Sequence, residues 1–157
     1  MASNVAGVIE PALQAAETAR SSRRPTADLT AYDLYLRAYA MVSSSARQIP
    51  DALRLMEAAI ARDPHHGPAL AWAAVCCQRL LYDNRSEDPA SDASKGADFA
   101  RRALAVAGDD PGTLTNAAVS LAAFGEDIDD MIALVDRALA LNPNFARGWH
   151  LSGVLRS

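Results

Sequence analysis

An internal repeat limits what this chain can fold into more than any other feature. Three segments of similar sequence recur at spacings of 44 and 35 residues, and each ends in a helix-breaking residue. These residues are Pro64, Gly108 and Pro143, and an alanine lies five positions before each of them, at Ala59, Ala103 and Ala138. Self-similarity at such periods indicates a fold built from stacked copies of one supersecondary unit.

The match between the segments continues after each helix-breaking residue. Six residues later comes a large apolar residue, and four residues after that a small one. The large residues are Leu70, Leu114 and Trp149, and the small ones are Ala74, Ala118 and Gly153. Small residues at these places would let two helices approach closely. The 34 alanines, against 9 aromatic residues, also favour helix and argue against an all-β fold.

Helical periodicity predicts the same architecture. Between residues 127 and 141, apolar residues recur at the three-and-four spacing of one buried helix face. The sequence as a whole predicts seven repeat helices, at 29–43, 49–62, 67–82, 92–107, 111–124, 128–141 and 145–156. Residues 5–20 predict a further helix without the repeat signature, and residues 21–25 a polar linker. The polar segment 82–94 is either a binding loop or a tolerated surface insertion.

The repeating unit resembles the tetratricopeptide repeat, a helix-turn-helix of about 34 residues with fixed aromatic, small and proline positions. Tyr32 and Tyr39 take the aromatic positions of the first unit, whereas Leu36 departs from its small position. In the second unit, Gly96 and Gly108 stand where the family has alanine and proline. The resemblance implies an all-α, right-handed superhelical solenoid of about three and a half units. The units are 27–66, 67–110, 111–145 and a partial unit 146–157, preceded by an N-terminal helix and linker at 1–26.

The entry to the first unit is similar to a junction found in large bacterial signalling proteins. Residues 29–37, with the sequence LTAYDLYLR, follow an alanine-rich segment. In those proteins a cyclase or winged-helix output domain, and a domain similar to the amino-terminal part of TolB, precede C-terminal tetratricopeptide repeats. This resemblance implies that residues 1–24 are the tail of an upstream region, and that the chain is part of a bacterial signalling or regulatory protein.

Catalysis and metal binding are not expected. Cys76 and Cys77 are adjacent, and so are His65 and His66, whereas zinc ligands are spaced at least two residues apart. Cysteines packed inside a helix and a polar turn at the histidines are the better interpretation. The acidic run 126–130 lacks the pattern of a calcium-binding loop. Its Asp127 is expected to cap the N-terminus of the helix that follows. Because no nucleophile has an identifiable base, the sequence predicts no enzyme and no cofactor.

A helical repeat array is expected to bind other proteins, because its first helices line a continuous concave face. Helical phase places ten candidate contact residues on that face: Asp33, Arg37, Met41, Val75, Gln78, Arg79, Thr115, Val119, Arg147 and His150. Their mixture of apolar side chains and arginines predicts a protein or peptide partner. A terminal carboxylate would meet Asp33 unfavourably, so the carboxylate clamp of chaperone-binding family members is not expected.

Self-association is the alternative. The last predicted helix carries an apolar face without a following helix in this chain, formed by Trp149, Leu151, Val154 and Leu155. Such a face tends to find a partner, and a second copy packed around a two-fold axis would cover it. The sequence therefore predicts a homodimer through this helix as the second possibility.

Charge and hydropathy argue against other partners. The net charge is −4, and the arginines at 20, 23 and 24 lack interleaved aromatic residues, so nucleic acid is not predicted. No apolar run approaches the roughly 18 residues of a membrane span, so no membrane association is predicted. The first residues lack a secretory signal, and adjacent cysteines do not make a routine disulfide, so a cytoplasmic location is expected.

Overall fold

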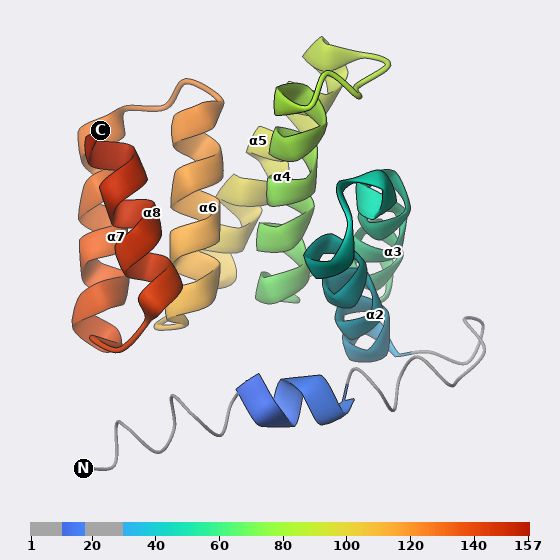
Figure 1. Ribbon diagram of the computed structural model, residues 1–157, viewed down its shortest axis with the longest axis horizontal. Coiled ribbons are helices and arrows are strands. Elements are labelled where there is room, and N and C mark those ends of the chain that lie inside the picture. The colour runs from blue at the N-terminus through green and yellow to red at the C-terminus, as the bar shows by residue number, and fades with distance from the viewer. Residues whose placement is uncertain (1–10, 18–29) are drawn as a thin grey trace.

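The computed structural model describes residues 11–17 and 30–157, and their regular structure is entirely helical (Figure 1). A short helical stretch at 11–17 precedes the repeat region. The repeat helices are α2 (Ala31–Ser44), α3 (Ile49–Arg62), α4 (Gly67–Tyr82), α5 (Pro89–Val106), α6 (Pro111–Ala123), α7 (Ile128–Leu141) and α8 (Ala146–Arg156), with a 3-10 turn η2 (Ala46–Gln48) before α3. The predicted all-α class is confirmed for this part of the chain. None of the described helices is long and apolar enough to cross a membrane.

The predicted helix spans agree closely with the structure, with one clear exception. Helices α3, α4 and α7 have the predicted bounds, and α2, α6 and α8 differ by one or two residues. Helix α5 begins at Pro89 rather than 92, because Asp88 accepts a hydrogen bond from the Ser91 N–H and Pro89 occupies the first turn. The segment between α4 and α5 is therefore residues 83–88, shorter than the predicted 82–94. Of the helix predicted at 5–20, residues 11–17 are helical and the rest, like the linker 21–25, lies outside the described residues.

Side-chain caps begin most of the repeat helices. Thr30 and Asp33 form a reciprocal capping box at the start of α2. Asp110 caps α6 by accepting from the Thr113 N–H, 3.1 Å away. Asp127 caps α7 by accepting from the backbone N–H groups of residues 129 and 130, which confirms the role predicted for it. A capping carboxylate also faces the positive end of the helix dipole, so it stabilises the helix start both by hydrogen bonding and by its charge.

The helices alternate between two environments. Helices α4 and α6 are buried on most sides, and each contacts the helix before it, the helix after it and the next even-numbered helix. Helices α3, α5 and α7 are amphipathic and expose charged residues on their outer sides. Figure 1 shows α8, α6, α4 and α2 following one another across the molecule from left to right, and contacts join each of these helices to the next.

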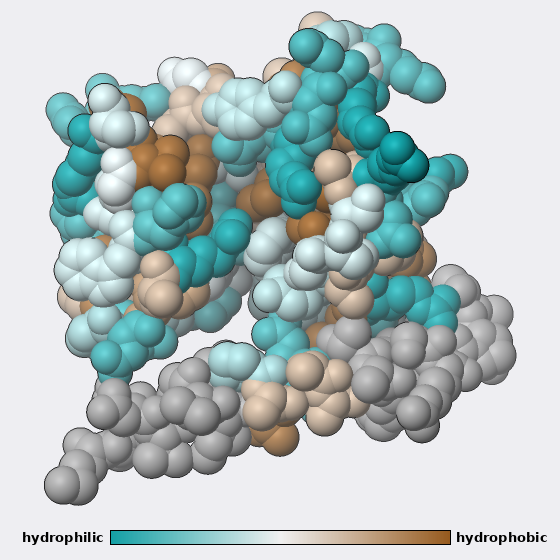
Figure 2. Space-filling model, in the orientation of Figure 1, coloured by the Kyte–Doolittle hydropathy of each residue, from teal (hydrophilic) through white to brown (hydrophobic). Residues whose placement is uncertain are grey.

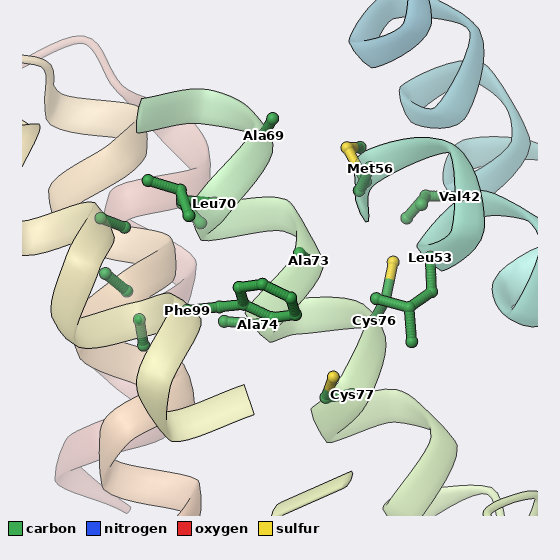
Figure 3. Close-up of a cluster of buried hydrophobic side chains, with 14 of the residues drawn as sticks. Val42, Leu53, Met56, Ala69, Leu70, Ala73, Ala74, Cys76, Cys77 and Phe99 are labelled. Carbon is green, nitrogen blue, oxygen red and sulfur yellow. The ribbon is translucent and has the colours of Figure 1, made fainter. Parts of the chain in front are cut away.

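Small residues occupy the helix contacts, as the repeat pattern predicted. The repeat alanines are all fully buried: Ala59, Ala74, Ala103, Ala118 and Ala138. In α2 the Leu36 that departs from the small position is itself fully buried, as is Ala38 two positions later. Figure 3 shows part of the core around α4, where Cys76 lies on the side of Val42 and Leu53. The interpretation of both cysteines as packing residues is confirmed, since both are fully buried.

Candidate protein-binding surface

Aromatic rings run along α2 and continue onto α4. The rings of Tyr32, Tyr35 and Tyr39 follow one another on α2, with centroids 6.2 Å apart at each step. Tyr35 lies 5.2 Å from the ring of His66, and Tyr39 meets Trp72 of α4 edge-on at 5.1 Å. Offset and edge-on pairs at these separations are the favourable geometries for aromatic side chains. Tyr39 therefore faces α4, and Tyr32 and Tyr35 lie beside the residue that caps it.

Arg147 extends this cluster to the other end of the molecule. Its guanidinium, carried by α8, lies 4.8 Å from the centroid of the Trp72 ring on α4. Its Nε and Nη2 groups donate to Oδ1 of Asn116 on α6, at 3.2 and 3.1 Å. One side chain thus joins α8 to both α6 and α4. We call the set Tyr32, Tyr35, Tyr39, His66, Trp72, Asn116 and Arg147 the aromatic–arginine surface; Tyr35 and Asn116 are buried beneath it and support the other five.

Polar contacts further along the same helices reinforce this arrangement. Ser120 of α6 donates to Oε1 of Gln78 on α4 at 3.2 Å. Arg79 of α4 donates to the backbone carbonyl of Val42 near the end of α2 at 3.1 Å. Helices α2, α4, α6 and α8 are therefore linked by side chains that also border the aromatic–arginine surface. In Figure 2 the hydrophobic atoms on this side of the molecule appear as separate areas among hydrophilic ones.

The electrostatics of the surface depend on burial. Burial raises the pKa of the Tyr35 hydroxyl well above its usual value, so the ring stays neutral. Burial lowers the pKa of His66, whose Nδ1 accepts a hydrogen bond from the Ala69 N–H at the start of α4. Packing also desolvates Arg147 and lowers its pKa, although the residue keeps an exposed side and an arginine remains charged at neutral pH. At neutral pH the charge at the centre of the surface is thus that of the guanidinium.

The short helical stretch at residues 11–17 contacts one end of this surface. Gln14 donates through Nε2 to the Tyr35 hydroxyl at 3.2 Å, and the Tyr32 hydroxyl donates to the carboxylate of Glu17. Leu13 of the same stretch is exposed. This stretch therefore contacts α2 through hydrogen bonds to two tyrosine hydroxyls. The rings of Tyr39 and Trp72 instead contact each other, and Arg147 lies against the ring of Trp72.

Four of the ten residues predicted to face a partner are instead buried: Asp33, Val75, Thr115 and Val119. Asp33 was predicted to be exposed, but it lies in the first turn of α2 and closes the capping box there, which buries it. The Asp33 carboxylate accepts instead from the Thr30 backbone N–H and hydroxyl. Thr115 is fully buried and its hydroxyl has no hydrogen-bond partner.

The other predicted contact residues keep some exposure. Arg37, Met41, Gln78 and Arg79 are half-buried, and Arg147 and His150 are exposed. Trp72 and Asn116 were not predicted to face a partner; Asn116 lies one position after Thr115, which helical phase assigned to that face. A large aromatic residue within an otherwise small-residue helix was the available signal for Trp72; nothing in the sequence indicates that it meets Arg147.

The apolar face predicted on α8 is present only in part. Trp149 is 58% exposed and Val154 is 51% exposed, whereas Leu151 is half-buried and Leu155 is buried. Leu155 was predicted to be exposed, but it belongs to the main hydrophobic core. A Cβ added at Gly153 would meet no atom within 4 Å, so the face beside it is open.

Aromatic rings supply contact area and a guanidinium supplies directional hydrogen-bond donors, and the two lie together here at Trp72 and Arg147. Within the described residues, no group of three or more histidine, cysteine or acidic side chains is placed to hold a metal ion. Comparison with known proteins identifies no relative: no protein-family model matches the chain, and no curated protein is significantly similar to it.

Proposed function

We propose that this chain is a non-catalytic protein-interaction module, which binds a peptide or a segment of a partner protein along α2, α4, α6 and α8. The observation that carries the proposal is the aromatic–arginine surface, in which side chains from all four helices meet. Tyrosine, tryptophan and arginine are the residue types enriched at the energetic centres of protein interfaces. Here they are brought together from residues 32 to 147, although aromatic residues make up only 6% of the chain.

The architecture we propose for the module is a tetratricopeptide-like solenoid. Two features support it: the repeated alternation of an inner helix with an amphipathic outer one, and the fully buried alanines at the repeat spacing. In such an array the stacked helix pairs create an extended concave binding surface. The charged outer sides of α3, α5 and α7 agree with helices that lie on the opposite, solvent-facing side.

The two tryptophans make the proposal testable by fluorescence. In a Trp149→Phe background, Trp72 is the sole tryptophan and reports directly on the proposed surface. Peptides selected from a random phage-displayed library should change its emission on binding. The Tyr39→Ala variant should weaken binding, because Tyr39 packs against Trp72. Tyr82→Ala removes an equally large but exposed ring at the end of α4, and it should leave binding unchanged.

Two results would reject the proposal. The first is a library selection on folded protein that recovers no peptide above background. The second is recovery of peptides whose affinity falls equally in Tyr39→Ala and Tyr82→Ala, since binding would then lie elsewhere.

Homodimerisation through α8 is a second candidate, favoured by the exposure of Trp149 and Val154 beside the open space at Gly153. An exposed apolar face of this kind favours an isologous contact between two copies. Light scattering across a concentration series should then show a dimer that Val154→Glu dissociates. A wild-type protein that stays monomeric at high concentration rejects this candidate and leaves the first untouched.

A further inference from the structure

Charge is distributed unevenly between the inner and outer helices. Helices α2, α4, α6 and α8 together carry four arginines and one acidic residue, Asp33, which is buried in its capping box. Helices α3, α5 and α7 carry seven acidic and six basic residues. The whole chain has a net charge of −4. Within these spans the inner row is basic in an acidic protein. The carboxylates of Glu17 and Asp110 act at the tyrosines of α2, so the attraction for an acidic partner should centre on Arg79 and Arg147.

The two sets of helices also differ in how their cations are paired. On the outer helices, Arg54 pairs with Asp51 and Arg102 with Asp98, each within its own helix. On the inner row, Arg156 pairs with Asp136. Arg79 and Arg147 donate instead to neutral oxygens, those of Val42 and Asn116. No carboxylate of the described residues makes an ion pair with either of them.

Arg79 and Arg147 both keep hydrogen-bond donors to spare. Burial is the main cause of the lowered pKa of Arg147; Tyr39 opposes this shift, and the charge of Arg79 adds to it. A guanidinium has five N–H donors, and each of these two arginines uses only some of them on its neutral acceptor. A carboxylate at each guanidinium would accept from the remaining donors.

We propose that the partner segment is acidic, and that side-chain carboxylates on it are bound by Arg79 and Arg147 beside the rings of Tyr39 and Trp72. This inference rests on the proposed function and specifies the chemistry of the ligand. Recognition uses carboxylates along the segment, so it needs no free chain terminus. Arg147 would hold one carboxylate over α6, while Arg79 would meet another near the end of α2.

The test uses two blocked synthetic peptides, acetylated at the N-terminus and amidated at the C-terminus. One alternates glutamate with alanine, and the other alternates glutamine with alanine. Roughly 10 residues suffice, because an extended chain covers about 3.3 Å per residue and neighbouring helices lie about 8–10 Å apart. With Trp72 as reporter in the Trp149→Phe background, the glutamate peptide should bind about tenfold or more tightly than the glutamine peptide. Its affinity should also fall steeply as salt is raised.

Variants assign the binding to the two arginines. Arg79→Gln combined with Arg147→Gln should reduce the affinity for the glutamate peptide about tenfold or more. The matched control combines Arg54→Gln with Arg102→Gln, which removes the same charge from the outer helices and should change affinity little. Arg147→Lys preserves the charge but not the two-pronged donor geometry, so it should lie between the wild type and the double variant. Circular dichroism verifies that each variant is folded.

Three results would overturn the inference. If the glutamate and glutamine peptides bind equally while library-selected peptides still bind at Tyr39, acidic recognition is rejected and the proposed function stands. If the control variant weakens binding as much as Arg79→Gln with Arg147→Gln, the attraction is a general effect of charge. If neither the blocked peptides nor any library peptide binds, the inference and the proposed function fail together.

Discussion

Two glycines in helices offer a direct test of the packing. A Cβ added at Gly96 of α5 would lie 2.8 Å from Cβ of Cys77 and 2.5 Å from Cζ of Phe124. A Cβ added at Gly153 of α8 would meet nothing within 4 Å. Replacing glycine by alanine inside a helix stabilises it by about 1 kcal/mol. Forcing an extra methyl group into a packed contact costs about 1–3 kcal/mol, which matches or exceeds that gain at Gly96.

Gly96→Ala should therefore change the free energy of unfolding by about 0 to −2 kcal/mol, whereas Gly153→Ala should raise it by about 0.5–1 kcal/mol. Because both variants carry the same gain in helix propensity, the difference between them measures the steric cost at Gly96. Urea unfolding followed by circular dichroism gives both values, and 1 kcal/mol corresponds to about 2–4 °C in Tm for a chain of this size. If Gly96→Ala stabilises the protein as much as Gly153→Ala does, then α5 does not approach α4 as closely at Gly96 as the structure shows.

Other predictions concern caps, thiols and pH. Asp127→Ala should lower the free energy of unfolding by about 1 kcal/mol in a urea titration, and an unchanged midpoint would show that the cap contributes nothing. Cys76 and Cys77 should resist a thiol reagent until the protein unfolds, since burial raises their pKa to about 12; rapid labelling of native protein would contradict this. For His66, burial lowers the pKa from 6.5, so the unfolded state binds its proton more tightly, and stability should fall as the pH drops below 6.5. His66→Asn keeps a capping acceptor and should remove that part of the pH dependence, which unfolding titrations above and below pH 6.5 would reveal.

Helix spans could be predicted from sequence because the breaks are local. Pro64, Gly108 and Pro143 each follow a helix end, and Gly108 adopts a positive φ of 54°, which glycine favours. The late start predicted for α5 was avoidable, since an aspartate followed by a proline at 88 and 89 is a local signal for the start of a helix. These features depend on neighbouring residues alone, so no knowledge of the tertiary fold was needed.

The candidate surface could be predicted only in part, because it depends on helix rotation and on distant contacts. Helical phase placed Asp33 on the exposed face, whereas its capping contacts with Thr30 bury it. Periodicity identifies an apolar stripe but does not say which neighbour it meets. The contact of Trp72 with Arg147 joins residues 75 positions apart in sequence. Such a contact follows only from the stacking of α4, α6 and α8.

Arg147 connects the stability of the fold with its proposed binding chemistry. Asn116 is only 3% exposed, and a buried amide oxygen without a donor is costly, so Arg147 stabilises α6 where it lies. The same guanidinium covers the Trp72 ring, which lowers the cost of holding a charge away from water. Arg156 has its charge balanced by the Asp136 carboxylate, whereas Arg147 meets a neutral amide. The fold therefore uses donors of Arg147 without neutralising its charge, which is the property that the proposed carboxylate ligand requires.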